Sequence, residues 1–418
     1  MIKTKKTDSY FRNSGHWKKT RFFFCLVYGL FFAPCSTQAQ NFLPQGEAPE
    51  VYRIIEMHNF RKRENGKYIG AAYREIRGTL RRGGKNVDGG FVYTGRFYVL
   101  EETKRAARLA AAPVDESFPA EVSLNPFGAV EAGSPGRFPT MRSFPALPRE
   151  AIRVGANWQA PAERILDPLF SGSITPAPVY VDYTYTGPGE YKGFPGHYLK
   201  AKYAIRYHGG ESAAADLDEA SGVHEANIFL PSEAGGPRLI SETFKEQYRY
   251  RGGRELSLEG TVLTFFEGVV PLDRPETLNR VARLLPAKVP AGDIPGIEVE
   301  SRPEGVALTV NNLLFEADSA RLLPSENARL DALAQTLLSL PDRNFLVVGH
   351  AADLGKPAGE KQLSLERARA ISEALEKRGV PPGRLLYEGR GSSQPVAPNT
   401  SGEGRARNRR VEIIILEG

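Results

Sequence analysis

Along residues 304–418, short apolar runs that fit β-strands alternate with apolar stripes that fit α-helices. Residues 324–340 carry leucines and alanines at helical spacing, and residues 360–378 form a second such stretch. The run 345–348 is apolar throughout, which is typical of a central strand covered on both faces. These features predict the order β-α-β-α-β-β, a two-layer α/β sandwich with helices on one face of a mixed sheet. Further strands are expected at 306–310, 385–387 and 410–416.

Arg367 stands out in the second expected helix. It lies four residues after Leu363 and four before Ile371, so it shares their apolar face. A guanidinium on such a face needs an anionic partner, because an unpaired buried charge is costly. The residues leave two interpretations open. One is an internal salt bridge, for example to Glu412 or Asp353, and the other is capture of a ligand carboxylate by two parallel hydrogen bonds.

Three motifs in this part of the chain form a combined pattern. They are LFEADSA at 314–320, LSLERA at 363–368 and GRARNRRVE at 404–412. Together they resemble the OmpA-like domain family, which holds peptidoglycan without covalent bonds. The resemblance covers residues 304–418, a little over a quarter of the chain, and it implies the α/β fold predicted above together with a non-catalytic role in a bacterial envelope.

The resemblance also implies where a ligand binds. In the family, a Gly-His-Thr-Asp loop after the second strand and the Arg of a Leu-Ser-x-x-Arg-Ala motif clamp the diaminopimelate of the stem peptide in the cell wall. The Arg holds a carboxylate and the Asp holds the charged ammonium end. The ligand-binding residues expected here on this basis are Arg367, Asp353, Ser364, Asn408 and Arg409.

The loop at 349–355 departs from the family pattern. Its two glycines keep the family spacing, but Ala352 occupies the position of the Asp, and Glu360 stands where the family usually has Asn. A charge-assisted hydrogen bond contributes about 1.5–3 kcal/mol. Loss of one carboxylate contact is therefore expected to weaken binding by roughly one to two decades. Asp353 is adjacent to Ala352 and reaches the pocket only if the loop shifts.

Residues 40–272 show the period of two that is typical of β-strands. In residues 198–207, apolar positions alternate with Lys and Arg, as expected of a half-buried antiparallel strand. Asn65-Gly66 indicates a hairpin turn. The Ala- and Pro-rich residues 106–148 predict a long irregular connection or a partly disordered insert. The alternation is compatible with a membrane-spanning barrel, but the irregular spacing and the Pro-rich interruption favour a soluble β-sandwich or partly open barrel.

The first 39 residues read as an export signal. A basic leader precedes the apolar run 22–33, which is shorter than the about 20 residues that a membrane-spanning helix needs. Thr37-Gln38-Ala39 supplies the small residues that favour cleavage after Ala39. An uncleaved anchor is one alternative. Lipidation at Cys35 is another, although the preceding Pro34 fits a lipidation box poorly.

These boundaries divide the chain into five segments. They are a signal peptide at 1–39, a β-rich domain with a long Pro/Ala-rich loop at 40–148, a second β-rich region at 149–272, a linker with a short helix at 273–303, and the OmpA-like domain at 304–418. The two β-rich regions either form one domain or stand apart.

Removal of the leader changes the electrostatic character of the chain. The whole chain has a formal charge of +6, but the leader holds seven Lys or Arg and one acid, so 48 basic and 48 acidic side chains remain. A nucleic-acid-binding protein needs a basic stripe in its mature part, so no nucleic-acid partner is expected. Cys25 and Cys35 both lie in the leader, which leaves the rest without disulfides, reactive thiolates or Cys-ligated metal.

The residues after the leader offer no recognisable catalytic constellation. No two histidines have metal-ligand spacing, and His224-Glu225 lacks the second His of a zinc-protease helix. A Gly-x-Ser-x-Gly nucleophile motif does not occur in the sequence. We therefore expect no catalytic residue, no metal and no cofactor.

The sequence as a whole favours a non-enzymatic periplasmic protein, with association to the outer membrane left open. Its OmpA-like domain is expected to bind the stem peptide of peptidoglycan, and its β-rich part is expected to contact another, unknown envelope protein. One alternative is an OmpA-like fold that has lost diaminopimelate recognition through Ala352 and serves as a protein-interaction module. A third hypothesis is an enzyme within residues 40–272 that acts on glycans.

Overall fold

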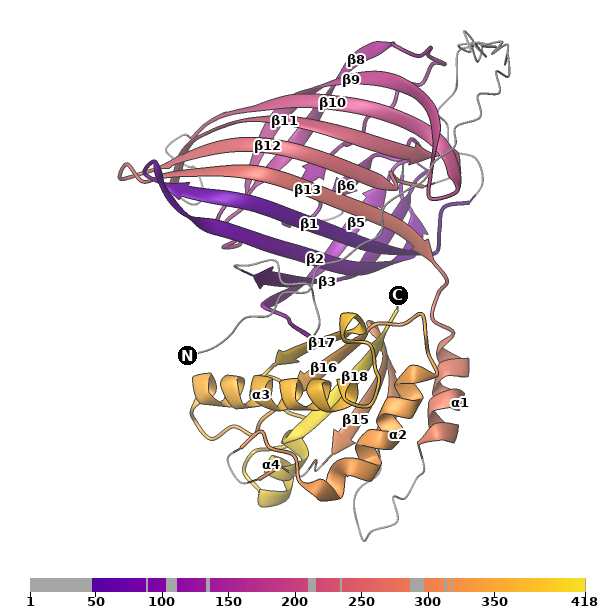
Figure 1. Ribbon diagram of the computed structural model, residues 1–418, viewed down its shortest axis with the longest axis vertical. Coiled ribbons are helices and arrows are strands. Elements are labelled where there is room, and N and C mark those ends of the chain that lie inside the picture. Colours follow the sequence, from indigo (N-terminus) through magenta and orange to yellow (C-terminus); the bar gives the residue numbers. More distant parts are fainter. Residues whose placement is uncertain are drawn as a thin grey trace, which may run out of the picture. The chain divides into compact units, whose positions relative to one another are not determined.

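The computed structural model describes residues 47–417, apart from 88, 103–110, 133–135, 210–215, 234, 286–296, 312, 314, 317 and 318. The expected leader, which holds both cysteines, lies outside the described residues. Of the expected linker at 273–303, residues 286–296 also lie outside them. The described chain builds one sheet of twelve strands and one of six (Figure 1). Among these residues, no helix is both long enough and apolar enough to span a bilayer.

The larger sheet contains all strands from residue 51 to residue 269 except one. Neighbouring strands run antiparallel in the order β6-β5-β3-β2-β1-β13-β12-β11-β10-β9-β8-β7. The segments on both sides of residue 148 therefore share a single sheet. The irregular connection predicted for residues 106–148 is wrong in part, because β5, β6 and β7 of this sheet lie within it and pair with their neighbours. The strands are β1 (Val51–Glu64), β2 (Lys67–Lys85), β3 (Phe91–Glu102), β5 (Glu116–Leu124), β6 (Val130–Ala132), β7 (Met141–Arg142), β8 (Asn157–Leu166), β9 (Thr175–Tyr191), β10 (Phe194–His208), β11 (Leu217–Pro231), β12 (Leu239–Tyr250) and β13 (Glu255–Val269).

The two ends of this sheet meet at one point. The backbone N of Val130, at the start of β6, donates to the carbonyl O of Phe144, just after β7, at 3.1 Å. The backbone N of Ser143 donates back to the carbonyl O of Val130 at 2.9 Å. The sheet is thus a nearly closed barrel, and of the two predicted forms the partly open barrel is confirmed. The sandwich form is not what the strands build.

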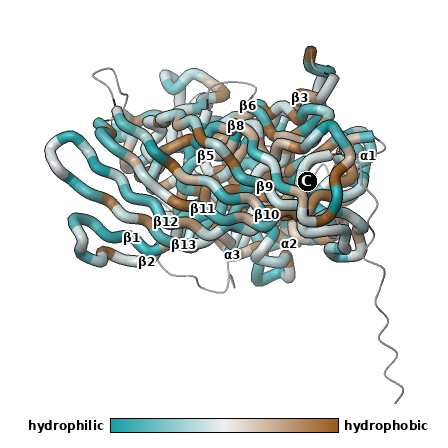
Figure 2. Tube along the Cα trace, turned by 90° about the horizontal axis from the view of Figure 1, so that it is seen from above, coloured by the Kyte–Doolittle hydropathy of each residue, from teal (hydrophilic) through white to brown (hydrophobic). Residues whose placement is uncertain are grey.

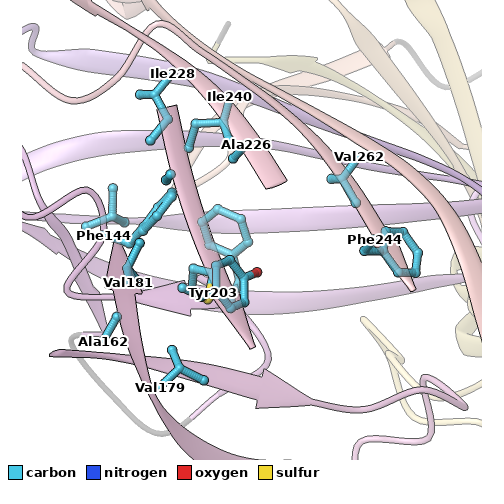
Figure 3. Packing of buried hydrophobic residues seen from close by; sticks show 14 of the residues in the cluster. Phe144, Ala162, Val179, Val181, Tyr203, Ala226, Ile228, Ile240, Phe244 and Val262 are labelled. Carbon is cyan, nitrogen blue, oxygen red and sulfur yellow. The ribbon is translucent and has the colours of Figure 1, made fainter. Parts of the chain in front are cut away.

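The alternation in the sequence sorts side chains to the two sides of the barrel wall. On β10, Leu199 and Tyr203 are buried, while Lys200 and Lys202 are exposed. In Figure 2, hydrophobic and hydrophilic residues are interleaved along the strands for this reason. Figure 3 shows side chains from β8 to β13 gathered inside the barrel. Residues 65 and 66 have φ of 47° and 77°, the left-handed conformation that a two-residue hairpin turn requires.

The barrel interior also contains a buried cluster of charges centred on His224, which is 1% exposed. Its Nδ1 contacts Glu242, and its Nε2 lies 3.3 Å from Oε1 of Glu246. Arg164 Nη2 donates to Glu246 Oε1 at 3.3 Å, and the hydroxyl of Tyr203 donates to Glu242 Oε1 at 2.7 Å. The rings of His224 and Tyr203 stack with their centroids 4.3 Å apart. With His224 protonated, the two carboxylates are balanced by two cations.

The pKa values follow this balance. Burial alone would lower the pKa of His224, but its hydrogen bond to Glu242 and the nearby Glu246 carboxylate outweigh burial and raise it. Burial raises the pKa of the Glu246 carboxyl, but His224 and Arg164 more than offset this and lower it to about 2. The folded barrel therefore favours the protonated imidazole and the ionised carboxylate.

We expect the free energy of unfolding to fall as the pH rises above neutrality. Because the pKa of His224 is raised in the folded state, its stabilisation is complete below the unfolded value of about 6.5 and is lost as the pH passes the folded value. Urea unfolding from about pH 6 to about pH 9, followed by the fluorescence of Trp158 on β8, measures this. His224→Gln should flatten the slope, and His208→Gln, at an exposed site, should not. An equal slope in His224→Gln and the wild type contradicts the assignment.

The smaller sheet has the order β14-β15-β18-β16-β17-β4 and is mixed, because β16 runs parallel to β17 and antiparallel to β18. The elements follow the order β15, α2 (Asn327–Leu338), β16, α3 (Pro357–Glu376), β17, α4 (Gly402–Asn408) and β18. This order confirms the predicted α/β sandwich, and α4 is a short helix that was not anticipated. Two strands were not anticipated: β14 precedes residue 304, and β4 comes from the connection between β3 and β5. The bounds are β4 (Ala112–Pro113), β14 (Ile297–Arg302), β15 (Gly305–Asn311), β16 (Phe345–Gly349), β17 (Leu385–Gly389) and β18 (Arg410–Leu416).

Helices cover one face of this sheet. Leu330, Leu333 and Leu337 of α2 lie on one stripe and pack with Leu308 and Ile413 of the sheet. The opposite face also contributes to a buried cluster, so the central strand β16 is covered on both sides as expected. The helices are α1 (Arg274–Leu284), α2 (Asn327–Leu338), α3 (Pro357–Glu376) and α4 (Gly402–Asn408), with short 3-10 turns at Pro324–Glu326 and Pro382–Arg384.

Candidate functional site

Two loops lie side by side at the end of the parallel strand pair. The loop 350–356 follows β16 and the loop 390–399 follows β17. The backbone N of Arg390 donates to Gly349 O at 2.9 Å, and the backbone N of Ala351 donates to Gly391 O at 2.9 Å. These bonds extend the strand pairing, so the loops after the two strands form one connected surface.

The N-terminal half of α3 packs directly on the backbone of these strand ends. A Cβ at Gly349 would lie 2.0 Å from the carbonyl O of Ser364, and a Cβ at Gly389 would lie 2.4 Å from the backbone N of Leu365. Only glycine permits this approach, because backbone atoms cannot move aside as a side chain can. The two glycines therefore set how closely α3 approaches the site.

Ser364 and Asn408, both expected as ligand-binding residues, are fully buried. Ser364 Oγ accepts from the backbone N of Gly391 at 2.9 Å and donates to Lys361 O at 2.8 Å. Asn408 Oδ1 accepts from two backbone amides at 396 and 397, and its Nδ2 donates to Ala397 O at 2.8 Å. Both side chains therefore hold the loop 390–399 in place, Ser364 through the amide of Gly391 and Asn408 through the backbone at 396 and 397.

Asp353 is exposed in the loop 350–356, beside the buried Ala352. Its Oδ1 accepts from the backbone N of Gly355 at 2.9 Å, and its own backbone N donates to Asn399 Oδ1 at 3.2 Å. Asn399 is also bound by the Asn408 amide at 2.9 Å, so Asp353 belongs to the same connected set of loops. Arg409 is exposed directly after α4.

Arg367 lies one turn beyond Ser364 on α3 and contacts a different segment. Its guanidinium carbon is 4.9 Å from the ring centroid of Phe315, and its Nε donates to the carbonyl O of Ser319 at 3.3 Å. The side chain is half-buried. The structure therefore places this cation against an aromatic face in the connection between β15 and α2, a favourable electrostatic arrangement.

Glu412, one internal partner that the sequence left open for Arg367, is engaged by other cations. It is completely buried on β18, and its Oε2 accepts from Arg302 Nη1 at 2.5 Å. Its Oε1 accepts from Arg410 Nε at 2.8 Å, and His350 Nε2 lies 3.5 Å from Oε2. Burial would raise the pKa of Glu412, but His350, Arg302 and Arg410 hold it far below the usual value. The backbone N of His350, the first residue of the loop, donates to the carbonyl O of Arg410 at 3.0 Å, and this bond ties the loop to β18.

Glu360 is a residue whose structural role the sequence reasoning missed. Its Oε1 accepts from the backbone N of Leu354 at 2.7 Å and of Lys356 at 3.1 Å, and its Oε2 accepts from Ser392 Oγ at 2.5 Å. The Ser392 hydroxyl and the Leu354 amide lower the pKa of this carboxyl. The sequence signal was weak, because Glu360 stands at the fourth position of α3, one beyond the third position at which a capping-box Glu reaches back to the N-cap, and it offered only an acidic residue in the first turn.

Metal chemistry gains no support from the described residues. Within them, no group of three or more His, Cys, Asp or Glu side chains is placed to hold a metal ion. What the site offers is a half-buried guanidinium on an aromatic ring, an exposed carboxylate, and a loop whose backbone is fixed by hydrogen bonds at both ends.

Comparison with known proteins shows which proteins the C-terminal part of the chain is similar to. A family model described as "OmpA family" matches residues 314–409. Outer membrane protein A of Bordetella avium is 34% identical over 137 residues, which is 30% of this chain and 71% of that protein. Peptidoglycan-binding protein ArfA of Mycobacterium bovis is 35% identical over 109 residues, which is 26% of this chain and 33% of that protein. The crystal structure of the periplasmic domain of Helicobacter pylori MotB is 29% identical, covers 31% of this chain and 85% of that domain, and superposes with a TM-score of 0.29.

Proposed function

This chain belongs to the OmpA family, and from that premise we propose that residues 304–418 bind the stem peptide of peptidoglycan without covalent bonds and so attach the protein to the cell wall. One relative carries peptidoglycan binding in its name. The observation that carries the proposal is Arg367, which stands in the matched motif on the face of Phe315. A guanidinium so placed is suited to a carboxylate, because its planar fork makes two parallel hydrogen bonds.

The other expected residues take different parts in this proposal. Asp353 is the exposed carboxylate of the loop, and Arg409 is an exposed cation after α4. Ser364 and Asn408 act indirectly, because both are fully buried and shape the loops that a ligand meets. No residue is assigned a catalytic role.

The remainder of the chain completes the proposed function. We infer that residues 1–39 direct export to the periplasm and that the barrel contacts another component of the envelope. The protein would then link the wall to that component without catalysing a reaction. The relatives named above as outer-membrane and peptidoglycan-binding proteins are consistent with such a location.

Co-sedimentation of residues 40–418 with purified sacculi tests the wall-binding site. Arg367→Ala should lower the affinity by about one to two decades, because it removes the charge-assisted hydrogen bonds to the ligand carboxylate. The control is Arg369→Ala on the same helix, which removes an exposed guanidinium paired with Glu373 and should leave binding unchanged. Equal retention of Arg367→Ala and wild type on sacculi refutes the proposed pocket.

A second candidate function is that of a protein-interaction module that no longer binds peptidoglycan. One observation favours it. Ala352 supplies no carboxylate, and the adjacent Asp353 directs its Oδ1 to its own loop at Gly355. Wild-type protein should then fail to sediment with sacculi.

Retention of the wild type on sacculi separates the two candidates, and Ala352→Asp tests whether the missing carboxylate limits binding. If the wild type binds the wall, the added carboxylate should strengthen binding by about a decade, since it restores a charge-assisted contact. If the wild type does not bind, Ala352→Asp should create binding. Leu354→Asp, which adds the same charge at an exposed site in the same loop, is the matched control and should do neither.

A further inference from the structure

The six-stranded sheet has a layer of apolar side chains on each of its two faces, and the helices cover only one of them. The second face carries six side chains that are each no more than 6% exposed: Ala307 of β15, Leu346 and Val348 of β16, Leu386 of β17, and Ile414 and Leu416 of β18. An uncovered layer of this kind would leave apolar area in water, at a cost of about 25 cal/mol for each Å². The low exposure of these side chains therefore requires another part of the chain to pack on this face.

Residues of the barrel and of the connection that follows β3 pack on this second face. One buried cluster joins the six side chains to four others, from β3 and from the connection: Tyr98, Leu100, Ala112 and Val114. Phe97 belongs to the cluster inside the barrel, so its neighbour Tyr98 lies on the outer side of the barrel wall. Tyr98 is nevertheless only 4% exposed, and Leu100 is 1% exposed. Each of the two apolar surfaces thus removes the other from water.

The connection also forms backbone hydrogen bonds with both sheets. Its strand β4 pairs in parallel with β17 at the edge of the six-stranded sheet. The backbone N of Val114 donates to the carbonyl O of Tyr387 in β17 at 2.8 Å. The next amide, of Asp115, donates to the carbonyl O of Val99 in β3 at 2.9 Å. Consecutive amides therefore bond to different sheets, and the chain passes from one sheet to the other without a free residue between them.

Polar side chains surround the apolar contact. Arg77 pairs with Tyr98 across β2 and β3, so it lies on the same outer side of the wall. Its Nη1 donates to the carbonyl O of Gly383 at 3.2 Å. Further along β2, Arg81 Nη1 donates to Oε1 of Glu417 at 2.5 Å. An apolar centre with a hydrogen-bonded rim is the arrangement of a stable protein interface.

We propose that this contact fastens the barrel to the OmpA-like domain, with residues 111–114 as a docking strand, so that the two parts stay joined even when the chain between β13 and α1 is cut. The partner of the second sheet face is then a segment of this same chain. Domains joined by a small polar contact move relative to each other, whereas a well-packed apolar contact prevents such motion. A domain bound to the cell wall would therefore hold the barrel in place and would not act as a flexible tether.

The test uses residues 40–418 with a protease site inserted after Val270, which is 78% exposed between β13 and α1. After complete cleavage, the fragments 40–270 and 271–418 should elute together in size-exclusion chromatography at micromolar concentration, because the apolar contact and the strand pairing remain. Elution of the wild-type fragments as two separate species overturns the proposal.

Val114→Asp tests the docking strand itself. Val114 is 9% exposed within the contact, and a carboxylate buried there without a partner is costly, so the cleaved fragments should separate. Val114→Ile keeps the apolar side chain, and its fragments should stay together. The matched control is Val87→Asp, which adds the same charge at a fully exposed valine and should also leave the fragments together. Uncleaved Val114→Asp should keep the circular dichroism spectrum of the wild type, and co-elution of its fragments contradicts the role of residues 111–114.

An engineered disulfide gives a second readout on the uncut chain. Residues 40–418 contain no cysteine, so Ala112→Cys with Leu386→Cys introduces a single pair. The two positions are directly paired between β4 and β17. Neighbouring strands lie about 4.8 Å apart, within the about 4.4–6.8 Å that a disulfide spans between Cα atoms.

Mild oxidation should close this disulfide within one chain, and the product should migrate faster on a non-reducing gel. Failure of the folded chain to form it shows that β4 does not lie beside β17 in solution, and the proposal then fails. None of these readouts uses sacculi, so they decide the inference whether or not the domain binds the cell wall.

Discussion

Arg164→Ala should lower the free energy of unfolding of the barrel by about 3–5 kcal/mol, the usual consequence of removing one partner from a buried ion pair. Arg164 is 8% exposed and binds Glu246, whose neighbour in the cluster is His224. Without the guanidinium, two buried carboxylates face a single protonated imidazole. Because Trp17 lies in the leader, Trp158 is the sole tryptophan of residues 40–418, and its fluorescence during urea unfolding reports on the barrel.

Two further variants test the reason for this loss. Arg249→Ala removes an exposed arginine that pairs with Asp218 and Glu219, and the loss should be within about 1 kcal/mol. The double variant Arg164→Met with Glu246→Gln removes both charges and should recover much of the lost stability, since the cost lies in the unpaired charge. If Arg164→Ala is no more harmful than Arg249→Ala, the cluster does not stabilise the barrel as described.

Glu412→Ala should have an effect of similar size on the C-terminal domain, about 3–5 kcal/mol. The carboxylate is completely buried, and its loss leaves Arg410 without its carboxylate partner, while Arg302 keeps only the exposed Glu300. Calorimetry of residues 40–418 should show the domain melting earlier. Glu403→Ala, at an exposed position on α4, is the control and should leave the melting temperature unchanged.

The Glu412 carboxylate also determines how the stability of the C-terminal domain is expected to change at acid pH. Because the pKa of Glu412 is held far below its usual value, its stabilisation is present above the unfolded value of about 4.3 and is lost only as the pH falls through the folded value. The wild-type domain should therefore become less stable as the pH falls below about 4. In Glu412→Gln this part of the acid dependence should disappear, and an unchanged acid profile contradicts the proposed role.

The α/β domain was predictable from sequence because its information is local. Leu330, Leu333 and Leu337 repeat at helical spacing, and the run 345–348 is apolar throughout, so each element reveals its own type. The parallel pairing of β16 with β17 follows from the intervening helix. The strand β4 escaped prediction because two residues carry no periodicity, and only their place beside β17 makes them a strand.

The long strands of the barrel were predictable from the period of two, but β5, β6 and β7 within residues 106–148 were not, and the sequence did not decide between a barrel and a sandwich. The alternation along β10 identifies an antiparallel strand with one buried face, yet β1 pairs with β13, some two hundred residues along the chain. The pairing of strands that are far apart in the sequence depends on loop closure and packing. The residues of a single strand carry no information about either. The inward positions of Glu242 and Glu246 interrupt the apolar period on β12 and were a signal of the interior cluster, but the partners that neutralise them come from β8 and β11.

For the site, the sequence by itself determined which residue types are available: Arg367 in its motif, Ala352 in place of a carboxylate, and Glu360 in place of an amide. The tertiary structure decided what each one does. Ser364 and Asn408 match the family motifs, but the close packing of α3 and α4 on the loops buries them and directs their polar atoms to the backbone. The role of Glu360 depends on Leu354 and Ser392 reaching the same carboxylate. Motifs record the identity of side chains, whereas burial and hydrogen-bond partners arise only when distant segments pack together.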